Sequence, residues 1–111
     1  MHYKVFYYFQ RSNDVLSSAN AMEMSARDIR RQLLARLHTE DDYLGLIDSH
    51  DNVLQILCEP KAGLFWIEIP QDAARASWGR YVTMDELVEM VESLPPVFDH
   101  EKLPGLEYKP W

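Results

Sequence analysis

Asp48, His50 and Asp51 lie within four residues of one another and have the side chains best suited to chemistry in this sequence. A carboxylate beside an imidazole can serve as a general acid–base pair or bind a metal ion. Asp, Ser, His and Asn are also favoured in turns, where their side chains bond to the local backbone. Because these residues separate two apolar runs, the turn interpretation is favoured over the catalytic one.

Other residues with reactive or metal-binding side chains are scattered. His2, His38 and His100 are far apart in the sequence, and none has metal-ligand spacing with another. Cys58 lies in the apolar run VLQILC, which predicts a buried thiol. The chain has no glycine-rich phosphate loop, no G-x-S-x-G and no H-E-x-x-H motif. We therefore predict no catalytic residues, no metal and no cofactor, although active sites also assemble from distant residues.

The composition predicts a single folded domain over residues 1–111. Apolar residues make up 47% of the chain and charged residues 26%, as in a globular protein. One cysteine excludes an internal disulfide and suits a reducing compartment. The start MHYKVFYYFQ does not resemble a secretory signal, and no run approaches the about 20 apolar residues that span a bilayer. We expect a cytoplasmic protein that does not enter the membrane.

The net charge of -7 is unevenly distributed along the chain. Residues 25–38 carry four arginines and one aspartate, whereas residues 39–72 carry eight acids and one lysine. Residues 83–111 add a further local charge of -5. Nucleic-acid binding is disfavoured because phosphate neutralisation requires a basic surface. A basic protein partner would suit this distribution better, although many soluble domains are simply acidic.

The N-terminal part predicts a strand, a loop and a helix. Tyr3–Gln10 alternates Tyr3, Val5, Tyr7 and Phe9 with Phe6 and Tyr8, so both faces look covered and an interior strand is expected. Residues 11–21 are polar and read as a loop, followed by a short strand at Ala21–Met24. Ser25 can cap a helix over Ala26–Leu37, whose apolar residues recur at helical spacing and whose arginines occupy the outer side.

The C-terminal part predicts an antiparallel meander and a second helix. Its strands are YLGLID, VLQILCE and LFWIEIP, joined by the turns SHDN and PKAG. Residues 71–80 read as a connection and Gly79–Val82 as a short edge strand. Thr83 and Glu86 form a capping box that opens a helix over Met84–Leu94, which Pro95 and Pro96 end. Residues 97–111 are expected to run extended along the surface.

These elements predict an α+β fold: an antiparallel sheet of four to six strands, two helices on one face and an extended C-terminal tail. In the clearest strand, Phe65, Ile67 and Ile69 face the core, so Trp66 and Glu68 project from the other side. Tyr43 and Gln55 could lie on that same side in neighbouring strands. If the helices cover the core side, this second face is open, unless Tyr108 and Trp111 fold over it with the tail.

The order of features resembles that of small immunity proteins from bacterial polymorphic toxin systems. The resemblance rests on the aromatic first strand, the helix, the hairpin YLGLIDSHDNVLQILCE, the strand LFWIEIP, the passage GRYVTMDELVEMV and the proline-punctuated tail ending in Trp111. The resemblance covers most of the chain. It includes no diagnostic motif from which individual site residues could be assigned. It implies a cytosolic inhibitor of a nuclease or deaminase toxin that binds its target without catalysis.

Two functions are therefore open on the sequence. The first is a stoichiometric inhibitor that binds a basic partner, with the open face and the acidic turn as the contact surface. Its expected partner-binding residues are Trp66, Glu68, Tyr43, Gln55, Asp48 and Asp51. The alternative is a small enzyme or ligand-binding module that uses the Asp48–His50–Asp51 turn or a pocket under the tail.

Overall fold

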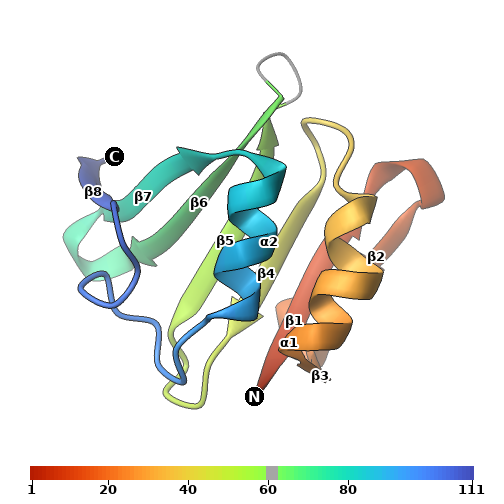
Figure 1. Cartoon of the computed structure of the whole chain (residues 1–111), viewed down its shortest axis with the longest axis horizontal. Coiled ribbons are helices and arrows are strands. Elements are labelled where there is room, and N and C mark those ends of the chain that lie inside the picture. Colours follow the sequence, from red (N-terminus) through yellow and green to blue (C-terminus); the bar gives the residue numbers. More distant parts are fainter. Residues whose placement is uncertain (60–62) are drawn as a thin grey trace.

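The computed structural model describes residues 1–59 and 63–111, and within them the chain forms one antiparallel sheet with its helices on a single face (Figure 1). The strands are β1 (His2–Phe9), β2 (Asp14–Leu16), β3 (Met22–Ser25), β4 (Tyr43–Ile47), β5 (Val53–Glu59), β6 (Leu64–Gln71), β7 (Ala76–Val82) and β8 (Glu107–Pro110). The α+β architecture is confirmed, but the sheet has eight strands in the described residues rather than four to six.

The strand order is β2-β1-β4-β5-β6-β7-β8, and β3 pairs with β1 beside β2. Strand β1 is interior, as predicted, because β4 pairs along one side while β2 and β3 share the other. Strands β4, β5 and β6 form the predicted meander. The predicted turn PKAG falls on residues 60–62, which lie outside the described residues, and on Gly63.

The first helical segment combines three kinds of turn: α1 (Ala26–Asp28), the π-helical η3 (Ile29–Leu33) and the 3-10 turn η4 (Leu34–Arg36). The Ser25 hydroxyl accepts the Asp28 backbone N–H at 3.1 Å, so the predicted N-cap is confirmed. The predicted helix over Ala26–Leu37 is therefore not a uniform α-helix, and it ends one residue earlier, at Arg36. Arg36 is also not free on the outer side: its guanidinium lies 4.3 Å from the Phe9 ring centroid and pairs with Asp14.

The second helix, α2 (Met84–Glu92), begins where the capping box predicted. The Thr83 hydroxyl accepts the Glu86 backbone N–H, and the Glu86 carboxylate accepts the Thr83 backbone N–H at 2.9 Å. The helix ends at Glu92 rather than Leu94, although Leu94 remains buried. Among the described residues, no helix has the length and apolarity needed to cross a membrane.

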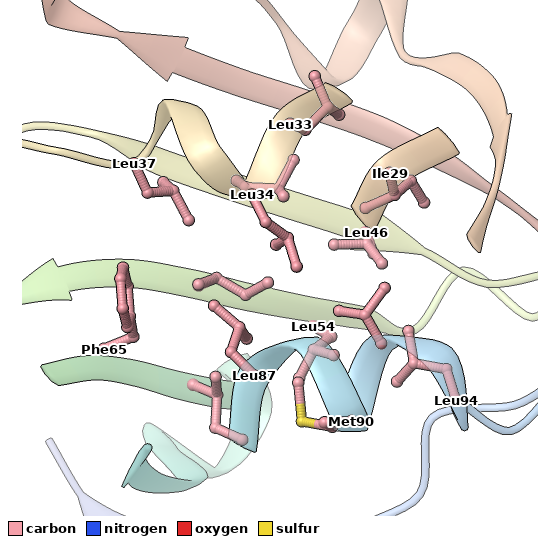
Figure 2. Packing of buried hydrophobic residues seen from close by; sticks show 14 of the residues in the cluster. Ile29, Leu33, Leu34, Leu37, Leu46, Leu54, Phe65, Leu87, Met90 and Leu94 are labelled. Atoms are coloured by element: carbon pink, nitrogen blue, oxygen red, sulfur yellow. The ribbon is translucent and has the colours of Figure 1, made fainter. Parts of the chain in front are cut away.

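The hydrophobic core fills the layer between the helices and the sheet. Figure 2 shows the side chains of both helical segments and of the central strands meeting in this layer. The helical segments contribute Ile29, Leu33, Leu34, Leu87, Met90 and Val91, and Leu37 and Leu94 follow just after their ends. Burying each such side chain stabilises the fold by about 1.5–3 kcal/mol. Phe65, Ile67 and Ile69 face the core from β6, as predicted.

Two predictions about the rest of the chain were wrong, and the prediction of an extended surface tail holds only for its last part, β8. The polar loop at 11–21 contains strand β2, whose three residues are too few to leave an alternation in the sequence. Strand β7 has seven residues and is not an edge, because β8 pairs with it. The tail therefore does not simply run over the surface. Phe98 and Leu103 are buried in the core, and β8 then pairs through its backbone with all four side chains exposed.

Candidate protein-binding face

The face of the sheet opposite the helices carries a transverse row of large apolar side chains. Figure 1 shows both helices on one side of the sheet, so the alternate residues of each strand point to the other side. Strand register places one residue from each of five strands directly opposite the next. We name these the aromatic row: Tyr8, Tyr43, Leu57, Trp66 and Tyr81.

A second row, one pair further along the strands, contains two glycines. It consists of Phe6, Gly45, Gln55, Glu68 and Gly79. A Cβ on Gly45 would lie 2.0 Å from the Phe6 ring, and a Cβ on Gly79 would lie 2.5 Å from the Trp66 ring. Each glycine therefore lets an aromatic ring lie against the sheet backbone, where any larger residue would displace it.

Trp66 is held in one orientation by neighbours on three sides. Its indole N–H donates to the Glu68 carboxylate at 2.7 Å, and Tyr81 meets it edge-on with 4.9 Å between ring centroids. The ring rests over Gly79, yet the side chain stays partly exposed to solvent. An aromatic side chain that is already ordered loses little conformational entropy when a partner covers it.

An acidic hollow borders the aromatic row at the end of β5. It measures about 520 Å³ and is lined by Trp66 and Tyr81 together with Glu40, Asp41 and Glu59. The three acids are exposed, and none forms an ion pair with a cation in the described part of the chain. Aromatic faces and unpaired carboxylates both attract cations, so this hollow suits an Arg or Lys side chain.

A second hollow of about 420 Å³ lies on the other side of Glu68, with Ile47, Val53 and Pro70 among its lining residues. Trp111 lies at its rim, 65% exposed. The Trp111 indole N–H donates to the Ser77 hydroxyl at 2.9 Å, and its backbone N–H donates to the Arg75 carbonyl at 2.8 Å. Trp111 thus extends the open face at its edge. The rest of the tail does not cover this face, since Phe98 and Leu103 pack in the core on the helix side and Tyr108 packs against Trp78 there.

Four of the six predicted site residues meet on this face. Gln55 and Glu68 are directly opposite each other, and Tyr43 and Trp66 flank Leu57 in the aromatic row. All four side chains are half-buried. Tyr8, Leu57, Tyr81 and the acids of the hollow also belong to this surface, although they were not among the predicted site residues. Period-two alternation indicates the face of each residue, but only the register brings these residues into one row.

Asp48 and Asp51 lie elsewhere, at the turn between β4 and β5. Asp48 is only 5% exposed, and its carboxylate accepts the backbone N–H groups of His50, Asn52 and Phe98. Burial alone would raise the pKa of Asp48, but these hydrogen bonds, with one from the Asn52 side chain, hold the pKa below its usual value. Asp51 is exposed with a φ of 63°. The hydrogen bonds of Asp48 therefore stabilise a turn and anchor the tail.

Cys58 faces the core at 7% exposure, and burial raises the pKa of its thiol, with smaller contributions from Asp42 and Glu59. A thiol in this state is a poor nucleophile. Within residues 1–59 and 63–111, no group of three or more His, Cys, Asp or Glu side chains is arranged to hold a metal ion. The candidate site on the open face is built from aromatic rings and carboxylates.

No protein-family model matches this chain, and neither a curated protein nor a solved structure is significantly similar to it.

Proposed function

We propose that this protein is a binding module that docks a basic protein against the open face of its sheet. The observation that carries the proposal is the aromatic row ending at the acidic hollow, with Trp66 already fixed between Gly79, Glu68 and Tyr81. Trp and Tyr are the residues that most often dominate binding energy at protein interfaces. Carboxylates beside them favour a partner that presents Arg or Lys.

The composition of the open face supports binding rather than simple solvation. An antiparallel sheet with one face in water usually alternates apolar inward positions with polar outward ones. Here the outward positions hold Tyr8, Tyr43, Leu57, Trp66 and Tyr81 in a continuous row. A contiguous apolar patch bordered by polar residues is typical of an interaction site.

The specific form that we propose is an immunity protein of the bacterial cytoplasm, which inhibits a cognate toxin by stoichiometric binding. The resemblance described from the sequence supplies this class of partner, and the charge of the hollow supports it. An acidic inhibitor can cover the cationic substrate-binding surface of a nuclease toxin, and complementary charge accelerates the encounter. The protein acts without catalysis in this proposal.

The proposal is tested with the product of the gene immediately upstream, where a toxin gene is expected. Tyr81 and Tyr108 make a matched pair: they are 53% and 47% exposed, on neighbouring strands. Tyr81 lies in the aromatic row, whereas Tyr108 packs edge-on against Trp78 on the helix side. We expect Tyr81→Ala to weaken binding by about 30-fold or more, the about 2 kcal/mol of an interface anchor.

Tyr108→Ala should bind as tightly as the unmodified protein, with affinities measured by calorimetry on the purified pair. Equal affinities for Tyr81→Ala, Trp66→Ala and the unmodified protein would exclude the open face as the docking surface. Failure of the upstream gene product to bind, together with its failure to poison cells in the absence of this protein, would overturn the immunity assignment.

A further inference from the structure

A separate hollow of about 240 Å³ lies on the helix side, between α2 and the tail. Ile67, Met90 and Leu103, all buried core residues, form its apolar part. Arg80 and Lys102 contribute positive charge, and Glu86 and Glu89 contribute negative charge. Its position on the opposite face of the sheet separates it from the aromatic row, so it carries no part of the proposed docking surface.

Arg80 is the unusual residue of this hollow. It is directly opposite Ile67 in the β6–β7 pair, so its side chain leaves the sheet on the core side. The side chain is 30% exposed, but its Nε atom is buried and has no hydrogen-bond partner in the described residues. Buried donors are nearly always paired, and an unpaired one on a charged group is costly. Because Nε has almost no accessible surface, a ligand in the hollow can reach the guanidinium only through its terminal Nη groups, which are not buried.

Glu86 does not supply this acceptor with good geometry. Its Oε2 atom lies 3.7 Å from Nη1 of Arg80, which is beyond hydrogen-bond distance. Its Oε1 atom accepts the Thr83 backbone N–H, which ties the carboxylate to the start of α2. On the other side, a Cβ on Gly105 would lie 3.2 Å from Cδ of Arg80. The tail backbone therefore packs against the arginine stem and shields it from solvent.

We propose that this hollow binds a small organic monocarboxylate, which pairs with the Arg80 guanidinium and places its apolar part on Ile67, Met90 and Leu103. The planar guanidinium fork matches a carboxylate better than a single point charge does. The two acids of the hollow disfavour a doubly charged phosphate. A hollow of about 240 Å³ has room for an acid of the size of benzoate.

The experiment uses benzoate as the probe on the full chain, with benzamide as its neutral counterpart of the same shape. We expect saturable changes in the amide NMR shifts of Arg80 and Gly105, with a dissociation constant in the millimolar range for so small a ligand. Benzamide should bind about tenfold more weakly or worse, since it lacks the charge-assisted hydrogen bonds.

Two substitutions should change benzoate affinity in opposite directions. Arg80→Gln should weaken binding about tenfold or more. Glu86→Gln should strengthen it, because Gln still accepts the Thr83 N–H but no longer competes for the guanidinium. Arg27→Gln, which removes an exposed arginine of α1, is the matched control and should change nothing. Trp66→Ala should also leave benzoate binding intact, since it lies on the other face.

If Arg80→Gln does not fold, benzoate affinity is measured for Arg80→Lys and Glu86→Gln instead. Arg80→Lys keeps the charge but loses the fork, so it should bind benzoate with reduced affinity. The proposal is overturned if benzoate causes no saturable shifts, if benzamide binds equally well, or if Glu86→Gln fails to tighten binding. None of these outcomes bears on docking at the open face, so the two proposals fail separately.

Discussion

Two buried carboxylates, Asp42 and Asp48, each accept four hydrogen bonds, three of them from backbone amides. Asp42 accepts from the amides of Gln10, His38 and Thr39, which joins the end of β1 to the loop before β4. Asp48 joins the β4–β5 turn to the tail through Phe98, with an N to Oδ2 distance of 2.6 Å. Each carboxylate thus connects chain segments that are far apart in the sequence.

Replacing Asp48 by Asn should destabilise the protein by about 3 kcal/mol. The amide nitrogen would face donors that now bond to a carboxylate oxygen, so buried N–H groups would lose their acceptor. Asp51→Asn is the control, with the same chemical change in the same turn at an exposed residue. Asn tolerates the left-handed backbone conformation of that position, so we expect a change below about 0.5 kcal/mol. Urea unfolding at pH 7 measures both, and equal stabilities would contradict the structural role of Asp48.

The same two carboxylates predict how stability depends on pH. Burial acts to raise the pKa of each, but hydrogen bonds dominate and lower both below the usual value of 3.8. The unfolded chain therefore binds these protons more readily than the folded protein. Their stabilisation is complete above about pH 5 and is lost as the pH falls below about 4.

Unfolding free energies measured between pH 7 and pH 2 should show this acid-side loss. Asp48→Asn should show a smaller loss, because one of the two titrating groups is gone. A loss of equal size in both proteins would show that Asp48 titrates as it does in the unfolded chain.

At the scale of single elements, successive residues of β6 point to opposite faces of the sheet, so one stabilises the fold while the next is available for binding. Phe65 is 7% exposed and belongs to the core, whereas Trp66 is half-buried on the open face. We expect Phe65→Ala to cost about 3–5 kcal/mol of stability. Trp66→Ala should cost much less stability but about 2 kcal/mol or more of binding to the partner.

Melting temperature and partner affinity distinguish the two variants. Should Trp66→Ala unfold the protein while its remaining folded fraction binds normally, the indole would be a packing residue. The assignment of Trp66 to partner recognition would then be wrong.

On the scale of the whole molecule, the helix side carries charges of both signs, including the exposed acids Asp85, Glu89 and Glu92 of α2. Exposed arginines of the first helical segment, Arg27, Arg30 and Arg31, lie on the helix side. The acids of the hollow, Glu40, Asp41 and Glu59, border the open face. If the proposed function is correct, the acids of the hollow attract the basic partner to the edge of the open face.

Neutralising the hollow with Glu40→Gln, Asp41→Asn and Glu59→Gln together should slow association with the partner and reduce its dependence on salt. The matched control neutralises three exposed acids outside the open face: Asp28→Asn, Asp85→Asn and Glu101→Gln. Both triple variants change net charge equally, so stopped-flow association rates isolate the position of the charge. Equal slowing by both would show that net charge, and not the hollow, steers the encounter.

The sequence by itself determined the features that depend on local periodicity and on short-range capping. Alternation in LFWIEIP correctly assigned Phe65, Ile67 and Ile69 to the core. The Thr83–Glu86 capping box set the start of α2, because both of its hydrogen bonds form within four residues. The facing of a strand and the start of a helix are local properties, so a single sequence records them.

Only the tertiary structure decided which residues form the open face. Tyr8 and Tyr81 belong to one row because four strand pairs between them fix the register, and register depends on turns and pairings across the sheet. Asp48 reads as an exposed turn residue, yet it is buried because Phe98, fifty residues later, donates its backbone N–H to it. Strand β8 buries no side chain, so its sequence has no alternation of apolar and polar residues that would predict a strand. Strand register, the burial of Asp48 and the pairing of β8 depend on contacts between distant parts of the chain, so local periodicity cannot predict them.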